Sequence, residues 1–312
     1  MTVGPRLFGC VEAGGTKFVV AIGNDRGEIL DHDRFPTSDP TSTLAATQAF
    51  LRQRSTVLGT LTAIGIGCFG PVELDRTSAQ YGFIGKTPKA GWRGTDMAGT
   101  FAREFSCPVG FDTDVNAAAL AEHRWGAARD VDSFVYLTIG TGIGGGVLID
   151  GVPIHGLMHP EIGHIYPRRH PLDLEFAGVC PFHGDCLEGV AAGPAIIART
   201  GVSLEQLDES HPQWEIEADY LGQLCAQLVM TISPQRIVMG GGVMNQTRLL
   251  PLIRPRLTHW LCGYIDRSEF LDGVDRYVVA PDLGDRAGVL GALALAMDAT
   301  QGHAGLVGTG VA

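Results

Sequence analysis

Short apolar runs separated by amphipathic stretches are the dominant pattern of this chain, and they predict an α/β protein. Each run is short enough to be a buried strand, and the runs lie at 8–13, 18–23, 63–68, 108–111, 134–139, 147–149, 236–239 and 277–280. Longer amphipathic or alanine-rich segments predict helices at 40–56, 117–126, 187–199, 214–232, 245–261 and 285–297. Thr41 or Ser42 is the expected N-cap of the first helix.

The order of these elements predicts a duplication. The series strand–strand–strand–helix–strand–helix begins at Phe8 and occurs again from Phe134, and each copy opens with two strands around a glycine turn. No residue-level repeat accompanies it, so the duplication rests on element order. Two similar α/β halves with a cleft between them would bring their glycine turns to face that cleft. The small, glycine-rich segment 299–312 is expected to be a flexible tail.

Composition narrows the class of protein. The chain has 312 residues, enough for two medium domains, and its 43 glycines are roughly twice the usual share. A net charge of -11 argues against a nucleic-acid partner. No apolar run is long enough to span a membrane, and the first residues lack a signal-peptide pattern. Buried thiols are expected at Cys10, Cys68, Cys107, Cys225 and Cys262, which favours a cytoplasmic, reducing compartment.

Three glycine turns are candidates for contact with a ligand. Gly14-Gly15-Thr16-Lys17 joins two strands and is open to two interpretations, a tight hairpin or a phosphate contact. The segment 140–146 has five glycines in seven residues, which close approach to a polyphosphate explains better than a hairpin does. Because strands flank it on both sides, it is not a dinucleotide-binding turn. The segment from Gly240 to Met244 follows a strand and precedes a predicted helix. Its glycines are explained by contact with an adenosine or, nearly as well, by close packing of that helix.

The sequence Asp112-Thr113-Asp114-Val115-Asn116 lies between a short strand and an alanine-rich helix. Asp114 is in the position of an ordinary helix N-cap. The alternative is a general base at the carboxyl end of a strand, where α/β proteins place their chemistry. Two further turns can line a ligand site: Phe69-Gly70-Pro71 and the loop 85–92, whose Trp92 is either a cleft residue or simply packed.

A compact group of cysteine and histidine residues predicts a metal site. Cys180, His183 and Cys186 have the spacing Cys-x2-His-x2-Cys, and His164 upstream completes a tetrahedral set. Two thiolates and two imidazoles fit a closed, structural zinc site rather than a catalytic one. His159 and His170 are rival fourth ligands, and two buried cysteines beside an exposed histidine would be the alternative without metal. A metal here would hold the nearby Glu161 loop in place.

Taken together, these motifs resemble the ROK family (repressors, open reading frames and kinases), and within it the bacterial fructokinase branch. The resemblance rests on the sequence 11–17, the Asp114 motif, the glycine run 140–146, His159-Pro160-Glu161-Ile162-Gly163-His164 and the metal cluster, and it spans Phe8 to about Met297. It implies a duplicated actin-like (ribonuclease-H-like) fold with a nucleotide and sugar cleft between two domains. The expected domains are 1–115, completed by the helix 285–298, and 116–284, which carries the zinc loop.

The resemblance also implies an activity and its residues. It predicts transfer of the γ-phosphate of ATP, with Mg2+, to a hexose, most simply D-fructose giving fructose 6-phosphate, with Asp114 as the general base. A homodimer joined through the second domain and a structural Zn2+ held by His164, Cys180, His183 and Cys186 are implied as well. Sugar contacts are implied for Gly70, Thr87, Thr113, Glu161, His164 and Glu188. Nucleotide contacts are implied for Gly14, Gly15, Thr16, Lys17, Gly140, Thr141, Gly142, Gly144, Pro194, Gly240, Gly241, Gly242, Val243 and Met244.

Two departures and three alternatives accompany this hypothesis. Glu12 stands where many family members have Asp, which leaves its part in Mg2+ binding open, and Ala90 replaces a proline usual in the 85–92 loop.

A kinase for mannose, glucose or N-acetylglucosamine is the first alternative. A repressor would need a DNA-binding motif ahead of Phe8, where only seven residues stand. A non-catalytic sugar-binding protein is disfavoured by the intact Asp114 and glycine turns.

Overall fold

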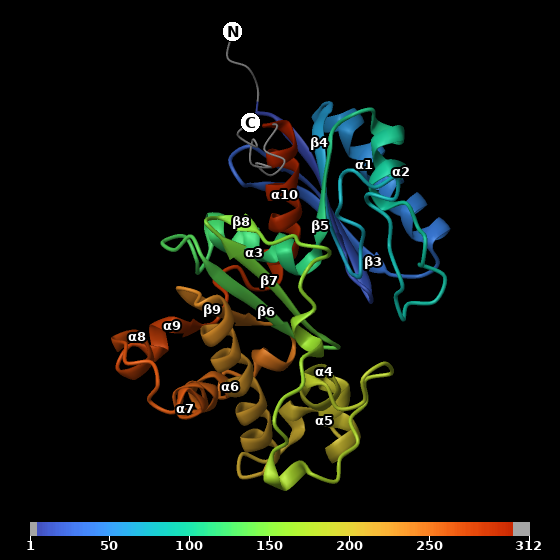
Figure 1. Cartoon of the computed structure of the whole chain (residues 1–312). Coiled ribbons are helices and arrows are strands. Elements are labelled where there is room, and N and C mark those ends of the chain that lie inside the picture. Colours follow the sequence, from blue (N-terminus) through green and yellow to red (C-terminus); the bar gives the residue numbers. More distant parts are fainter. Residues whose placement is uncertain (1–4, 302–312) are drawn as a thin grey trace. The chain divides into compact units, whose positions relative to one another are not determined.

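The computed structural model of the chain describes residues 5–301, which form two compact units (Figure 1). Unit 1 is formed by the described parts of 1–125, 151–159 and 285–312, and unit 2 by 126–150 and 160–284. Within the described residues, no helix has the length and apolar character needed to cross a membrane. Of the tail expected at 299–312, the part from residue 302 onward lies outside the described residues.

Unit 1 is built on a mixed sheet whose strand order is β3-β2-β1-β4-β5. Strand β2 is antiparallel to β1 and β3, whereas β4 is parallel to β1 and β5. The strands are β1 (Leu7–Ala13), β2 (Lys17–Asn24), β3 (Ile29–Pro36), β4 (Leu61–Cys68) and β5 (Val109–Thr113). The two-residue strand β8 (Val152–Pro153) lies in the segment 151–159 of this unit.

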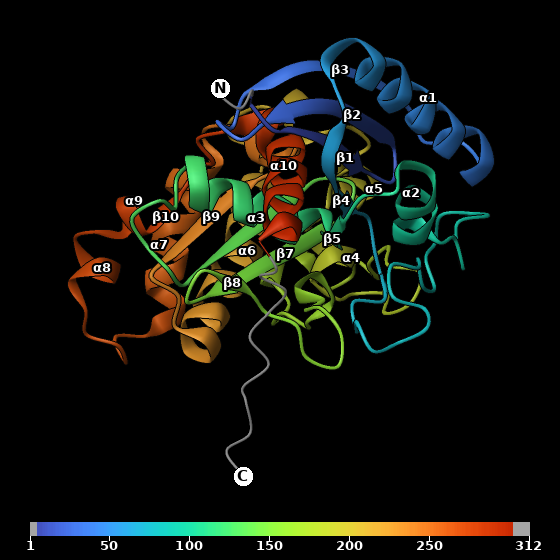
Figure 2. The ribbon, with the colours of Figure 1, turned by 90° about the horizontal axis from the view of Figure 1, so that it is seen from above.

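Helices cover both faces of the first sheet, as Figures 1 and 2 show. Helices α1 (Pro40–Leu58) and α2 (Met97–Phe105) contribute Phe50, Leu51, Met97 and Phe101 to the core on one face. Helices α3 (Asp114–Trp125) and α10 (Ala287–Thr300), the latter preceded by η5 (Gly284–Arg286), pack together against β4 and β5 on the other. A Cβ on Gly65 of β4 would lie 1.8 Å from the carbonyl oxygen of Ala292, so α10 rests directly on the strand.

Unit 2 repeats this topology. Its strands have the order β10-β9-β6-β7, in which β6 is antiparallel to β7 and parallel to β9, and β9 is parallel to β10. The same order and directions relate β5, β4, β1 and β2, so the duplication predicted from element order is confirmed. The strands are β6 (Phe134–Ile139), β7 (Ile143–Ile149), β9 (Arg236–Gly240) and β10 (Val278–Val279).

The helices of unit 2 include the long, largely buried α6 (Gln213–Ile232), which packs against α7 (Leu249–Leu261). The other α-helices are α4 (Leu187–Ala191), α5 (Gly193–Thr200), α8 (Ser268–Leu271) and α9 (Val274–Tyr277). Single turns of 3-10 helix complete the unit: η1 (Ile162–His164), η2 (Pro171–Asp173), η3 (Leu204–Gln206) and η4 (Val243–Asn245).

Several local predictions were wrong. The N-cap of α1 is Asp39, whose carboxylate accepts a hydrogen bond from the Ser42 N–H at 3.0 Å. The helix predicted at 187–199 is two helices, because Ala192 has extended backbone angles between α4 and α5. The helix predicted at 245–261 begins only at Leu249. Of the five cysteines expected to be buried, Cys107 is half-buried and Cys262 is exposed.

The glycine run 140–146 also differs from its prediction as one loop. Only its first residues form the turn, since β7 begins at Ile143 and contains the last three glycines. The physical reason is close packing: a Cβ on Gly145 would lie 2.6 Å from the Ile162 side chain, and one on Gly163 would lie 2.0 Å from the Ile143 carbonyl oxygen. Glycine in β7 and in η1 therefore allows the η1 turn to pack in close contact with the strand.

Candidate active site

Asp114 lies in unit 1, where β5 ends and α3 begins. The N-cap of α3 is its neighbour Thr113, whose hydroxyl accepts a hydrogen bond from the Asn116 N–H at 3.1 Å. The capping interpretation of Asp114 is thereby removed. Burial raises the pKa of Asp114 to about 6, while the Val115 N–H, 2.9 Å from its Oδ1, lowers it. Such a carboxylate is ionised at neutral pH and can still accept a proton.

Glu12, on β1, is a second half-buried carboxylate in unit 1. Burial raises its pKa to about 7; the Lys17 ammonium lowers it, and the charges of Asp114 and Asp285 raise it further. Its Oε2 is buried and has no hydrogen-bond partner within residues 5–301. Gly288 makes room for this carboxylate, because a Cβ there would lie 2.3 Å from the Glu12 carboxyl carbon. Three carboxylates and one lysine therefore interact electrostatically in this part of the unit.

The turn between β1 and β2 is exposed at Gly15, Thr16 and Lys17. Gly14 closes it by donating its N–H to the Lys17 carbonyl oxygen at 3.0 Å, and a Cβ on Gly14 would come within 2.8 Å of that oxygen. The hairpin is thus real and explains Gly14. The hairpin does not explain Gly15, because a Cβ on Gly15 would meet nothing within 4 Å and packing therefore does not require a glycine at this position. The exposed N–H groups and the lysine are available to an anion.

The turns predicted to contact sugar in unit 1 are fixed by specific bonds. His159 Nε2 accepts a hydrogen bond from the Val72 N–H at 3.2 Å and holds the turn that contains Gly70. Thr87 accepts a hydrogen bond from the Lys89 N–H at 3.3 Å. Trp92 is fully buried against Phe18 and Phe69, so it anchors the 85–92 loop rather than lining a cleft.

In unit 2, Glu188 fixes the turn that follows β6. Its Oε2 accepts a hydrogen bond from the Ile143 N–H at 2.9 Å, and a Cβ on Gly142 would lie 2.6 Å from the same oxygen. Within the turn, the Gly140 N–H donates to the Gly142 carbonyl oxygen at 2.9 Å. Glu161, the other carboxylate predicted to contact sugar, is exposed at the start of η1.

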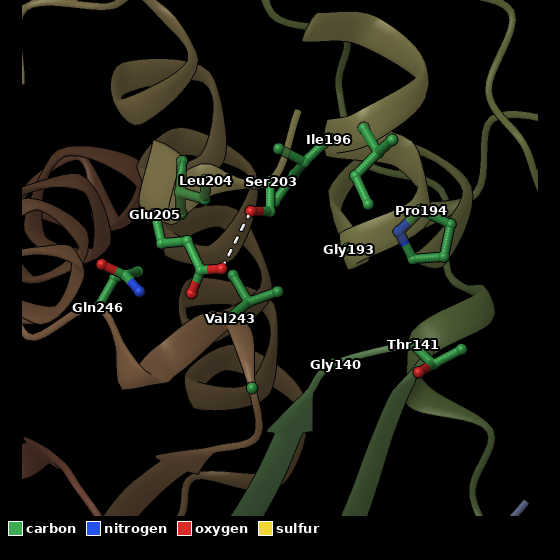
Figure 3. Close-up of a pocket in the computed structure, with 12 residues that line it drawn as sticks. Gly140, Thr141, Gly193, Pro194, Ile196, Ser203, Leu204, Glu205, Val243 and Gln246 are labelled. Atoms are coloured by element: carbon green, nitrogen blue, oxygen red, sulfur yellow. Dashed lines mark hydrogen bonds between the residues drawn. The ribbon is translucent and has the colours of Figure 1, made fainter. Parts of the chain in front are cut away.

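A pocket of about 420 Å³ adjoins this turn, and Figure 3 shows the side chains around it. It is formed where α5, η3 and the turn after β9 meet Gly140, whose carbonyl oxygen accepts a hydrogen bond from the Gly193 N–H at 2.8 Å. Of the predicted nucleotide residues in this unit, Gly140, Thr141, Pro194, Gly242 and Val243 line it. Gly142, Gly144, Gly240, Gly241 and Met244 are not among its lining residues.

Sequence reasoning missed part of this pocket's wall. Ser203, Leu204, Glu205 and Gln246 line it, and the Ser203 hydroxyl donates to Glu205 Oε1 at 3.2 Å (Figure 3). The only local signal was a capping box, in which the side chains of Ser203 and Gln206 bond each other's backbone N–H groups. That pattern marks the start of a helical turn and says nothing of a ligand.

The predicted metal ligands come together in unit 2. The ligand atoms of His164, Cys180, His183 and Cys186 all lie within 4.8 Å of one another. His164 Nδ1 is 3.5 Å from the Cys186 sulfur and 3.9 Å from the Cys180 sulfur, and His183 Nδ1 is 3.7 Å from the latter.

The rival ligands have other partners. His159 bonds the Val72 N–H, and His170 Nδ1 accepts a hydrogen bond from the Leu172 N–H at 3.2 Å. Neither histidine is part of the cluster.

A buried ionic network supports the metal loop. Asp173 accepts hydrogen bonds from Arg199 Nε at 2.7 Å and from the Tyr220 hydroxyl at 2.7 Å. Arg169 bonds both the Asp173 carbonyl oxygen and, at 3.0 Å, the Asp185 carboxylate inside the Cys-x2-His-x2-Cys segment. The segment is therefore linked to α5 and α6 through charged hydrogen bonds of Arg169 and Asp173.

Comparison with known proteins identifies the family. The family model described as "ROK family" matches residues 8–299. The chain belongs to the ROK family. A relative from Bacillus subtilis (strain 168) is 47% identical over 298 residues, which cover 96% of this chain and 98% of the relative. The fructokinase of Zymomonas mobilis subsp. mobilis is 44% identical over 297 residues, 94% of this chain and 97% of that enzyme.

The solved structures agree on the fold. The crystal structure of the ROK hexokinase from Thermus thermophilus superimposes with a TM-score of 0.77 at 26% identity, and the match covers 95% of this chain and 99% of that one. The two-domain, actin-like α/β kinase fold implied by the sequence motifs is confirmed. The fructokinase relatives likewise confirm the branch of the ROK family to which the motifs pointed.

Proposed function

We propose that this protein is an ATP-dependent sugar kinase that phosphorylates D-fructose to fructose 6-phosphate. The observation that carries the proposal is Asp114, a half-buried carboxylate whose pKa is raised to about 6 and which is free of a capping role. The ROK family model and the fructokinase relatives, each matching nearly the whole chain, support phosphoryl transfer to fructose as the reaction.

Asp114 accepts the proton of the sugar hydroxyl as that oxygen bonds to the γ-phosphorus of ATP, while the bond from this phosphorus to the β,γ-bridging oxygen breaks and ADP leaves. In unit 1, the exposed N–H groups at Gly15 and Thr16 and the Lys17 ammonium hold phosphate oxygens. In unit 2, the pocket beside Gly140 takes the nucleoside, and Glu188 keeps the Gly140–Gly142 turn in shape. The sugar contacts are assigned to Gly70, Thr87, Thr113, Glu161, His164 and Glu188.

Glu12 is the residue that fits a magnesium ion. Its buried Oε2 has no partner among the described residues, and its carboxylate shares its surroundings with Asp114 and Asp285. Oxygen ligands of this kind suit Mg2+, which neutralises charge on the transferring phosphate when bound. Glutamate in place of aspartate therefore keeps the function of this position.

A structural zinc ion fits the cluster of His164, Cys180, His183 and Cys186. Ligand atoms at the corners of a zinc tetrahedron are about 3.3–3.8 Å apart, given Zn–N and Zn–S bonds of about 2.0 and 2.3 Å. The contacts of 3.5, 3.7 and 3.9 Å in the cluster are close to these values. Because thiolates must stay reduced to bind zinc, the proposal includes a cytoplasmic location.

Zinc content tests this assignment directly. Elemental analysis of purified protein is expected to give one zinc per chain, and Cys180→Ser is expected to lose it. Cys225→Ser is the matched control, since Cys225 is a buried thiol outside the cluster. Full zinc retention in Cys180→Ser would contradict the site.

A second copy of the chain is the proposed partner. Four of the large apolar side chains of unit 2 that are more than half exposed lie between residues 166 and 182: Tyr166, Leu172, Leu174 and Phe182. The four fall within a stretch of seventeen residues that runs into the metal loop. Exposed apolar side chains that gather on one surface mark interfaces, which supports a second copy of the chain as the partner. Light scattering is expected to give twice the mass of the chain, and Leu172→Lys with Leu174→Lys is expected to shift it to the monomer.

Coupled release of ADP tests the activity itself. With MgATP, turnover is expected to be highest with fructose and at least tenfold lower in kcat/KM with mannose, glucose and N-acetylglucosamine. A preference for another hexose would keep the kinase and change its substrate. Absence of turnover with all four sugars in zinc-loaded protein would overturn the proposal.

A further inference from the structure

Unit 1 contains another cavity, of about 560 Å³, whose lining residues are not among those that we assign to ATP or sugar, although Asp112 in its wall is the neighbour of Thr113. Strand β5, helices α3 and α10, the segment that contains β8 and the loop before Ile84 enclose it, and Figure 1 labels these elements. Its wall includes Arg76, Tyr81, Asp112, His155 and Asp298. The proposed kinase mechanism uses none of these side chains.

A hydrogen bond between a histidine and a buried carboxylate forms one end of the cavity. Asp112 Oδ2 lies 2.8 Å from His155 Nε2, and the Asp112 side chain is only 3% exposed. This hydrogen bond raises the pKa of His155, while burial and the charge of Arg76 lower it. When the ring is protonated it carries a second N–H, on Nδ1, for which the described residues supply no partner, and a bound anion favours that form.

Arg76 provides a second cation at the same end. Its guanidinium carbon is 5.4 Å from the centre of the Tyr81 ring, and its charge acts on both Tyr81 and His155. No ion pair within residues 5–301 involves Arg76. Because two neighbouring cations repel each other, an anion placed between them would remove that cost and gain two charged hydrogen bonds.

The remaining walls offer acceptors and apolar surface. Asp298, ion-paired with Arg124, lines the cavity together with the side chains of Leu120 and Leu295. The hydroxyl oxygen of Tyr81 is buried without a hydrogen-bond partner among the described residues. Carboxylate oxygens accept hydrogen bonds from sugar hydroxyls but repel further anionic groups. The walls therefore suit a ligand with a single anionic group on a hydroxylated body rather than a polyphosphate.

We propose that this cavity binds a sugar phosphate, with the phosphate between Arg76 and His155 and the sugar hydroxyls toward Asp298 and Tyr81. The site is separate from the proposed kinase site and does not require that function to be correct. If the kinase assignment holds, the enzyme's own product belongs to this class of ligand.

The cavity shares elements with the acceptor side of the kinase site. Asp112 Oδ1 accepts hydrogen bonds of 2.7 Å from the Thr113 N–H and from Asn116 Nδ2, at the turn that carries Asp114. The segment that contains His155 continues to His159, which holds the Val72 N–H beside Gly70. A ligand that draws on the Asp112–His155 pair therefore acts on residues that adjoin the base.

Calorimetric titration with fructose 6-phosphate tests the proposal. Saturating fructose, without nucleotide, is present to occupy the kinase sugar site. Wild-type protein is expected to bind one fructose 6-phosphate per chain, and Arg76→Ala is expected to weaken this binding at least tenfold. Arg34→Ala, the removal of an exposed arginine on β3 of the same unit, is the matched control and is expected to leave the affinity unchanged.

Two further arms separate the outcomes. Inorganic phosphate is expected to bind at least tenfold more weakly than fructose 6-phosphate, and equal affinity would refute recognition of the sugar. Arg76→Ala is expected to turn over saturating substrates at the wild-type rate, because Arg76 lies outside the proposed kinase site. An inactive wild-type enzyme that still binds fructose 6-phosphate would refute the kinase assignment and leave the second site standing. No binding to wild-type protein, or the same affinity in Arg76→Ala, would overturn the second site.

Discussion

The Ile143 N–H donates a hydrogen bond to Glu188 Oε2 across forty-five residues of sequence, at 2.9 Å. This bond ties the helix that follows the metal loop to the first residue of β7. It gives Glu188 a structural task at the Gly140–Gly142 turn in addition to the sugar contact implied by the family. The two tasks can be separated experimentally.

Glu188→Gln keeps an oxygen that can accept the Ile143 bond, whereas Glu188→Ala removes it. We expect Glu188→Ala to raise the KM for ATP about tenfold, the equivalent of about 1.4 kcal/mol, because the turn beside the nucleotide pocket loses its support. Glu188→Gln is expected to change it less than threefold. Initial-rate kinetics with each substrate varied in turn provide the measurement. A rise in the KM for fructose alone, in both variants, would assign Glu188 to the sugar instead.

Asp114→Asn is expected to reduce kcat by about 10²–10⁴-fold with little change in either KM, because it removes the base but not the shape of the site. The wild-type kcat/KM is expected to fall about tenfold per pH unit below pH 6, where Asp114 becomes protonated. Asp33→Asn, an exposed change on β3, serves as the control. A wild-type profile that stays flat down to pH 5 would exclude Asp114 as the group whose ionisation limits the rate.

Glu12 should make the folded protein less stable at alkaline pH in the absence of Mg2+. Its pKa rises from 4.5 to about 7 on folding, so its ionisation disfavours the folded state as pH rises through this window. Glu12→Gln is therefore expected to stabilise the protein at pH 8 by up to about 3 kcal/mol, and by roughly 1 kcal/mol at pH 5.

Urea unfolding at the two pH values measures this difference. Mg2+ is expected to stabilise the wild type at pH 8 and to have a smaller effect on Glu12→Gln. Equal stabilisation of the variant at pH 5 and pH 8 would show that Glu12 does not titrate in this window. An unchanged effect of Mg2+ would remove Glu12 from the metal site.

Asp173 is expected to be among the most sensitive polar positions of unit 2. Its carboxylate is buried and bonds both Arg199 and Tyr220, so Asp173→Asn leaves buried arginine charge without its partner. A loss of about 3–5 kcal/mol in the free energy of unfolding is expected, against about 1 kcal/mol for Tyr220→Phe, which removes one hydroxyl bond. Thermal unfolding of both variants measures the two losses in the free energy of unfolding and so their ratio. Similar, small losses in both would show that the network adds little stability.

The sequence was sufficient where local pattern determines structure. Apolar runs located most of the strands but not β3, and the Cys-x2-His-x2-Cys spacing located three residues of the metal cluster, because each of these signals lies within a few residues. His164 lies sixteen residues before Cys180, and the family resemblance selected it over His159 and His170. Prediction from the sequence failed where contacts between residues far apart in the chain determine the structure. Nothing near Ile143 reveals that Glu188 bonds it, and nothing in 203–205 reveals that η3 forms a wall of the pocket. The last glycines of 140–146 looked like a loop because their real requirement, contact with Ile162, comes from another segment.

The position of α10 on the first sheet has a consequence for how the chain is made. The ribosome finishes β1, β4 and β5 long before it reaches residue 287, yet α10 supplies, together with α3, the cover of one face of these strands. All of unit 2 is synthesised in between. A nascent chain therefore carries an uncovered apolar sheet while its second half is translated, and chaperones that bind such surfaces have their longest opportunity at this stage.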